Sequence, residues 1–212
     1  MADVETIRKG SLAEAPMAGD HLAMDLLNTE ARDNGEDVDY WRSGDDVLEW
    51  LKRHGVVHGV AQPSADGLTE SSVELLVQGK ALRTLARRLI VQCKEDGGGK
   101  DKAMGDIAAL NEYLHAYRSA PHLEQDSEGK LALTRVARGE MIASLLGPVA
   151  EAVAHLLVEG NFALVKQCEH PDCILWFYDR TKAHKRRWCS MALCGNRYKA
   201  AQFRKRSSGE TT

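Results

Sequence analysis

Apolar side chains recur every three to four positions through most of the first 160 residues, a rhythm typical of helices that bury one face. The segments with this rhythm are residues 43–55, 69–93, 101–117 and 139–157. Ser43 and the acids after it predict a capped helix start, and Gly55 predicts that helix's end. Gly97–Gly99 is expected to end the second helix, and Gly160 to cap the last. Pro148 should kink the last helix or mark its restart, because proline removes a helical hydrogen bond.

Other segments carry weaker signals. Asp20–Thr29 is apolar enough for a short helix, although a strand is an alternative, and Asp33–Gly35 is interpreted as a loop. Residues 122–136 alternate loosely around a central glycine and predict a β-hairpin. Residues 174–178, Ile-Leu-Trp-Phe-Tyr, are typical of a strand. We therefore predict a mainly α fold with a small β-hairpin.

The cysteines add the first candidate chemistry. Four of the five lie within 27 residues, as Cys168-x4-Cys173, fifteen residues, then Cys189-x4-Cys194. Each short loop allows two sulfurs to point at one centre, and the spacer allows the second pair to return to it. Thiolate ligands favour zinc, with iron as the alternative metal. We predict one structural Zn²⁺, bound by all four cysteines within a treble-clef-like finger.

Other interpretations of these thiols are open. Two disulfides would require an oxidising compartment, which nothing in the sequence indicates. His170 or His184 could replace one cysteine as a ligand. Cys93, alone on a predicted helix face, is interpreted as a core residue. Because four protein ligands complete a tetrahedral shell, catalysis at this zinc is not expected.

Charge is distributed unevenly along the chain. Residues 161–212 contain eleven Lys and Arg against four Asp and Glu, a net charge of +7, whereas residues 1–160 carry −10. A basic end on an acidic body indicates a polyanionic partner, and DNA is the partner we expect. The residues predicted to contact nucleic acid are Arg186, Arg187, Arg197, Lys199, Arg204, Lys205 and Arg206. The alternative is that these bases solvate a helix or pair with the acidic body.

Two stretches resemble a known family. Residues 186–197, RRWCSMALCGNR, resemble the CGNR zinc finger, named for the motif that Cys194–Arg197 spells, and Cys168 and Cys173 match its first cysteine pair. Residues 18–29, AGDHLAMDLLNT, together with residues 43–55, resemble the ABATE domain that usually precedes this finger. The resemblance implies zinc at the four cysteines and a stress-induced bacterial transcription regulator.

A polar cluster near the N-terminus suggests a second site. His21, Asp25, Asn28 and Thr29 could line a pocket for a small effector, which would make the protein a ligand-responsive regulator. The alternative is ordinary capping, in which Asp25 and Asn28 bond to the backbone of the following loop. Capping is the interpretation that we favour.

These observations predict three segments: a mainly helical ABATE-like domain over 1–160, a CGNR-type finger over 161–206 and a flexible tail over 207–212. We expect a cytoplasmic regulator that is not an enzyme, because no nucleophile–base pair or phosphate-binding loop is found. We find no apolar run approaching the roughly 20 residues that cross a membrane. A homodimer would be usual for a DNA reader. The alternative function is a zinc-stabilised protein-interaction module, and a weaker one is an enzyme that uses the polar cluster.

Overall fold

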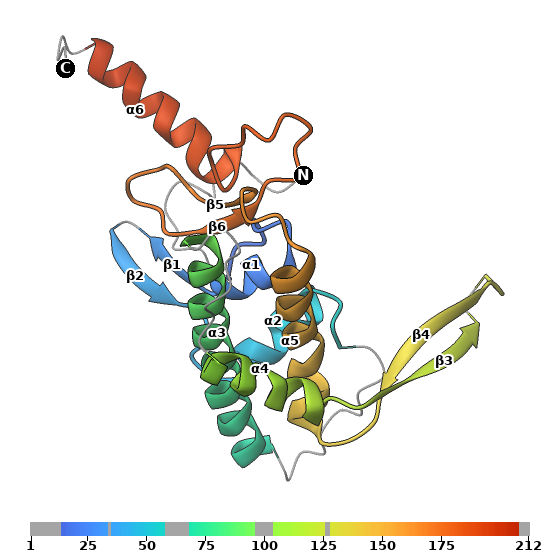
Figure 1. Cartoon of the computed structure of the whole chain (residues 1–212). Coiled ribbons are helices and arrows are strands. Elements are labelled where there is room, and N and C mark those ends of the chain that lie inside the picture. The colour runs from blue at the N-terminus through green and yellow to red at the C-terminus, as the bar shows by residue number, and fades with distance from the viewer. Residues whose placement is uncertain (1–13, 34, 58–67, 96–103, 126–127, 208–212) are drawn as a thin grey trace. The chain divides into compact units, whose positions relative to one another are not determined.

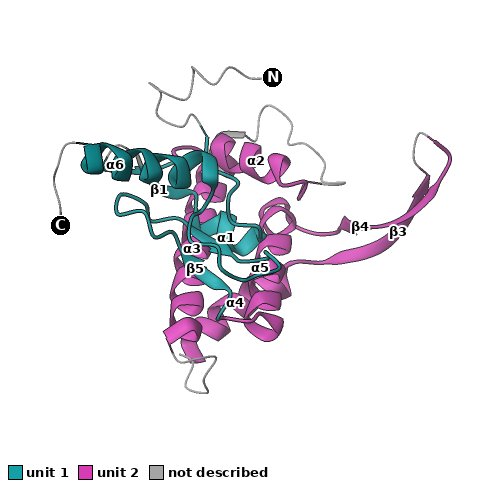
Figure 2. Ribbon diagram, turned by 90° about the horizontal axis from the view of Figure 1, so that it is seen from above, with its two compact units in different colours: residues 1–40, 163–212 teal, residues 41–162 magenta. Residues whose placement is uncertain are grey.

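The computed structural model describes residues 14–33, 35–57, 68–95, 104–125 and 128–207. The chain divides into two compact units, shown in Figure 2. Unit 1 joins Met1–Tyr40 to Ala163–Thr212, and unit 2 is Trp41–Phe162. The first forty residues therefore group with the cysteine-rich segment and not with the helices that follow them.

Unit 2 consists mainly of four helices (Figure 1). They are α2 (Gly44–Arg53), α3 (Leu68–Glu95), α4 (Met104–Ala116) and α5 (Met141–Glu159). The long helix α3 packs against the other three, and α4 also packs against α5. The buried stripe of α3 includes Leu82, Leu89 and Ile90, at the spacing that the apolar pattern predicts. All four predicted helices are confirmed, although residues 96–103, which hold the glycine run, lie outside the described part.

Local signals explain the ends of α2. The Ser43 hydroxyl accepts a hydrogen bond from the Asp46 N–H at 3.3 Å, and the Asp46 carboxylate accepts one from the Ser43 N–H at 2.8 Å. This reciprocal pair satisfies two donors that a helix start leaves without partners. Gly55 follows the helix with φ 65°, a conformation that glycine adopts without strain. The predicted start and end are therefore both confirmed.

Helix α5 runs without interruption through Pro148. It is also long and apolar enough to cross a membrane, with 19 residues and a mean hydropathy of 1.8. The sequence-based statement that no such run exists was therefore wrong. Its buried residues include Leu146, Val149 and Val153, which lie in the core of unit 2. A core helix of a globular unit passes the same test of length and composition.

The predicted hairpin is confirmed as β3 (Ser119–Gln125) paired antiparallel with β4 (Leu131–Ala137). Gly129, in the connection, has φ 81°. Leu123 lies opposite Leu133, and both side chains are largely exposed. The two strands extend beyond the helices of unit 2 in both views (Figures 1 and 2).

Unit 1 contains α1 (Leu22–Leu27), a first hairpin of β1 (Glu30–Asp33) and β2 (Glu36–Asp39), and a second of β5 (Val165–Gln167) and β6 (Trp176–Tyr178). It ends in a short π-helix, η3 (Met191–Gly195), and α6 (Asn196–Ser207). Helix α1 packs against β6. The short helix and the strand within 174–178 agree with prediction, and the mainly α fold with a zinc finger is confirmed.

The sequence did not predict the hairpin formed by β1 and β2. Residues 33–35 were interpreted as a loop, and Gly35 does lie in a turn with φ 89°. Asp33, however, is the last residue of β1 and pairs with Glu36, and Glu30 pairs with Asp39 in the same antiparallel hairpin. An Asn-Gly pair between short strands is a strong hairpin signal, so the sequence did contain the information.

Candidate metal centre and basic surface

The first cysteine pair is positioned by a strand end and a tight turn. Cys168 directly follows β5, and its N–H donates to the Leu175 carbonyl at 2.9 Å. The chain turns through His170, and the Cys173 N–H donates to the His170 carbonyl at 3.0 Å. These two bonds return the chain toward β6 and keep both cysteines on one side of the turn.

In the second pair, Cys189 lies two residues before η3 and Cys194 lies within it. The Ser190 hydroxyl accepts from the Leu193 N–H at 2.9 Å, and the Ser190 carbonyl accepts from the N–H groups of Cys194 and Gly195, at 3.1 Å each. Cys194 thus lies in a π turn directly before the first residue of α6. A side chain at Gly195 would place its Cβ 2.5 Å from the Met191 sulfur, so glycine allows the chain to pack closely here.

The four sulfurs converge. All four lie within 4.8 Å of one another, with 3.9 Å between Cys173 and Cys189 and 3.4 Å between Cys189 and Cys194. A tetrahedral zinc ion with Zn–S bonds of about 2.3 Å requires sulfurs about 3.8 Å apart. Cys168, Cys189 and Cys194 are buried, Cys173 is half-buried, and none is in a disulfide. The donor set fits one structural Zn²⁺, whose role is to cross-link the two turns.

Electrostatics show why a cation belongs here. Hydrogen bonds from the other three thiols lower the pKa of Cys168. In Cys173 the contact with Cys168 raises the pKa, but hydrogen bonds from Cys189 and Cys194 outweigh it and leave the pKa below its usual value. Contacts with the Cys168 and Cys173 sulfurs, reinforced by burial, raise the pKa of Cys189 and Cys194. Thiolates this close together repel one another, which disfavours deprotonation of all four at once. A divalent ion removes this conflict and holds all four deprotonated.

Asp179 organises the segment between the two cysteine pairs. Its buried carboxylate accepts from the Lys166 ammonium at 2.7 Å, the Thr181 hydroxyl at 2.6 Å and the Arg186 N–H at 2.9 Å. Burial alone would raise its pKa, but these hydrogen bonds hold the pKa of Asp179 well below its ordinary value. It therefore acts as a buried anion that ties β5 to the chain entering the second cysteine pair. Sequence reasoning did not find it, because a lone aspartate after a strand has no distinctive pattern.

Arg186 has an internal role. Its guanidinium donates to the carbonyls of Trp188 and Ala18 at 2.9 Å each, and also to the Cys189 carbonyl and the Asp20 carboxylate. It lies 4.3 Å from the centre of the Phe177 ring, and only 16% of the side chain is exposed. This arginine was predicted to contact nucleic acid. The structure uses its donors to fasten the N-terminal segment to the second cysteine turn.

The other predicted bases lie at the surface. Arg187 pairs with Glu169 at 2.6 Å and lies over the Trp188 ring. Arg197 lies against His170, with its Nε 3.3 Å from the ring Nε2. Helix α6 has no buried residue, and Tyr198 packs on Trp188 with 4.6 Å between ring centroids. The exposed bases of α6 are Arg197, Lys199, Arg204, Lys205 and Arg206.

The four residues predicted to line an effector pocket all make structural bonds. His21 caps α1 by accepting from the Ala23 N–H at 3.1 Å, and Asp25 accepts from the Gly19 N–H at 2.8 Å. Asn28 exchanges two hydrogen bonds with the backbone of Trp176. The Thr29 hydroxyl donates to the Leu26 carbonyl at 2.8 Å. Asp25 and Asn28 thus bond backbone groups, as in the capping interpretation, but these groups lie before α1 and on a distant strand and not in the following loop.

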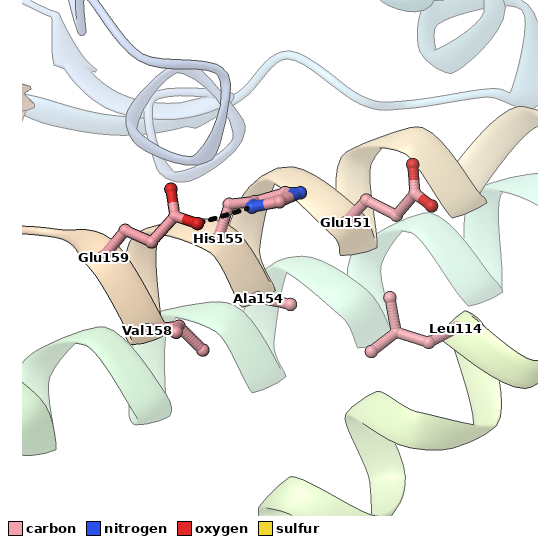
Figure 3. A pocket seen from close by; sticks show the side chains of 6 residues that line it. All are labelled: Leu114, Glu151, Ala154, His155, Val158 and Glu159. Atoms are coloured by element: carbon pink, nitrogen blue, oxygen red, sulfur yellow. Dashed lines mark ion pairs between the residues drawn. The ribbon is translucent and has the colours of Figure 1, made fainter. Parts of the chain in front are cut away.

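A pocket of about 310 Å³ lies elsewhere, between α4 and α5 in unit 2. Figure 3 shows its apolar side chains, which come from both helices, together with acidic groups that all come from α5. His155 and Glu159 approach to 3.6 Å. The lining residues are Leu114, Glu151, Ala154, His155, Val158 and Glu159, none of which the sequence singled out.

Comparisons with known families agree with this geometry. Residues 165–207 match the CGNR zinc finger, the segment that brings the four sulfurs together. Residues 20–160 match the ABATE family, described as "Putative stress-induced transcription regulator". No curated protein matches the chain. Both families are regulatory or zinc-binding, not enzyme families. Since the ABATE match covers well over half of its residues, this chain belongs to the ABATE family and ends in a CGNR zinc finger.

Proposed function

We propose that this chain is a zinc-stabilised transcription regulator whose finger binds DNA through the exposed bases of α6 together with Arg187. One observation carries the proposal: α6 buries none of its residues, although five of its twelve are bases. A helix that buries no side chain and carries this much positive charge contributes little to the stability of the fold. It is suited to displace counterions from phosphates, the main source of affinity in DNA binding.

We propose a smaller contact set than the sequence predicts. It leaves out Arg186, because the donors of this side chain are used within unit 1. The Arg197 guanidinium contacts the His170 ring, so we expect it to bind a phosphate only where that contact holds it. Lys199, Arg204, Lys205 and Arg206 form the main proposed contact. The location that we propose is cytoplasmic, where DNA and reduced thiols coexist.

The test is a salt series of fluorescence anisotropy with the zinc-loaded chain and mixed-sequence duplex DNA. Substituting Lys199, Arg204 and Arg206 by Gln should reduce the slope of log affinity against log salt by about 1 per lost phosphate contact. A matched control replaces three exposed bases around the β3–β4 hairpin, Arg118, Lys130 and Arg138, by Gln. It should leave the slope unchanged.

Two results would reject the proposal. One is no binding at low salt by protein that retains stoichiometric zinc, an outcome that would favour a protein-interaction module. The other is an equal loss of slope in the control variant, which would mean that net charge and not the α6 surface sets affinity. Sedimentation of the complex would count the chains per DNA, with two expected for a symmetric reader.

The effector-sensing part of the proposal moves to unit 2. His21, Asp25, Asn28 and Thr29 are engaged in structural bonds, whereas the pocket between α4 and α5 has the size of small-molecule sites. Apolar walls beside Glu151 and Glu159 suit a small organic cation with an apolar part. A thermal-shift screen of such cations should show stabilisation that Glu151→Gln weakens; no shift with any of them would remove this part.

A further inference from the structure

Phe203 is an exposed aromatic residue in the middle of a basic stripe. It lies on α6 with 71% of its surface accessible to solvent. Lys199 precedes it by four residues and Arg206 follows by three, so all three side chains lie on one face of the helix. Tyr198 lies about a quarter-turn from Lys199 and packs on Trp188, so it directs a different side of the helix toward the finger. The stripe therefore faces solvent.

The chemistry of the stripe restricts its partner. A helix that binds a membrane surface needs a broad apolar face, and α6 has only one large exposed apolar side chain, which is Phe203. The two residues that flank the ring are positively charged, so the partner is a polyanion that also presents a flat apolar surface. A nucleobase between two phosphates has both properties.

We propose that Phe203 stacks on an unpaired DNA base, with Lys199 and Arg206 contacting the phosphates on either side. The inference rests on the proposed DNA binding and specifies the form of DNA. In a closed duplex the base faces are covered by their neighbours, and opening one step costs a few kcal/mol. Unpaired bases present their faces without that cost. The two cations lie about 10.5 Å apart along the helix axis, which places the ring between them.

The test compares two probes with the zinc-loaded full-length chain: an oligothymidylate of about twelve nucleotides and a closed hairpin duplex. Phe203→Ala should lower affinity for the single strand about 5- to 150-fold, the usual effect of removing a base–aromatic stack. Affinity for the duplex should change less than about twofold. Phe203→Trp should retain single-strand binding, because tryptophan offers a larger stacking surface.

Three controls separate stacking from charge and from folding. The double variant Lys199→Gln, Arg206→Gln should bind both probes more weakly and should reduce the slope of log affinity against log salt for both. Leu133→Ala, at an exposed apolar residue of unit 2, should leave the affinity for both probes unchanged. Zinc content and melting temperature should be unaltered in Phe203→Ala, since the ring is exposed.

The outcomes separate this inference from the proposed function. Duplex binding without a selective single-strand loss in Phe203→Ala overturns the stacking role and leaves DNA binding intact. Failure to bind either probe overturns both. A single strand carrying 5-iododeoxyuridine provides an independent measurement: photocrosslinks should include Phe203, and crosslinks found only at other residues would exclude it.

Discussion

The side-chain amide of Asn28 and the backbone of Trp176 exchange two hydrogen bonds, each 2.8 Å long, across 148 residues of sequence. The amide donates to the Trp176 carbonyl, and its oxygen accepts from the Trp176 N–H. Asn28 is fully buried. It thus provides β6 with the pair of bonds that a neighbouring strand would otherwise make.

Asn28→Ala should destabilise unit 1 by about 2–3 kcal/mol, because both backbone groups of Trp176 lose their buried partners. Asn28→Asp should be at least as damaging, since a carboxylate oxygen would face the Trp176 carbonyl. The measurement is urea unfolding followed by tryptophan fluorescence. Unfolding midpoints equal to wild type in both variants would show that the bonds contribute nothing.

A fragment covering residues 163–212 should bind zinc more weakly than the full chain, although it contains all four cysteines. It lacks α1, which packs on β6, and Ala18 and Asp20, which hold Arg186. Zinc affinity measured by competition with a chromophoric chelator compares the two proteins. Equal affinities, with a well-dispersed NMR spectrum for the fragment, would contradict the structural role of the N-terminal segment.

Removing zinc should unfold unit 1 and leave unit 2 helical. Structural zinc contributes on the order of 10 kcal/mol of folding free energy to small modules. Helices α2 to α5 contain none of the four metal-binding cysteines. Chelation should therefore change near-ultraviolet dichroism and preserve most of the helical signal. Cys189→Ser should lose stoichiometric zinc, and the control Cys93→Ala, at a buried cysteine of α3, should retain one ion per chain.

Asp179 should make stability depend on pH in acid. Its folded pKa is lowered, so its stabilising contribution is fully present above the unfolded value of about 3.9 and is lost as pH falls through the folded value. The measurement is the difference in unfolding free energy between wild type and Asp179→Asn. That difference should be large at pH 7 and shrink below about pH 4. A constant difference would mean that the charge of Asp179 is not what stabilises the loop.

Two helical glycines should respond oppositely to alanine. At Gly147 of α5 the new Cβ would lie 2.1 Å from the Tyr117 ring, so Gly147→Ala should cost about 1–3 kcal/mol or more through overpacking. At Gly105 of α4 nothing lies within 4 Å, and Gly105→Ala should stabilise by up to about 1 kcal/mol through helix propensity. Thermal melts would compare them; stabilisation by both would show that Tyr117 can move away at little cost.

Local signals were sufficient for much of this fold and for the metal ligands. The capping pair at Ser43 and the rhythm of α3 and α5 act between residues one or two helical turns apart, and the four cysteines lie within 27 residues. The β1–β2 hairpin was also encoded locally, by Asn34–Gly35, and was overlooked. Asp179 and the internal role of Arg186 were not accessible in the same way, because each depends on partners brought together by folding.

The sequence by itself determined the helices, the zinc ligands and the charge of the C-terminal segment, because periodicity, turn chemistry and ligand spacing are properties of neighbouring residues. Only the tertiary structure decided that residues 1–40 join the finger, that Arg186 serves packing while α6 remains exposed, and that Asn28 completes β6. These outcomes depend on contacts between segments more than 100 residues apart, whose partners no local pattern specifies.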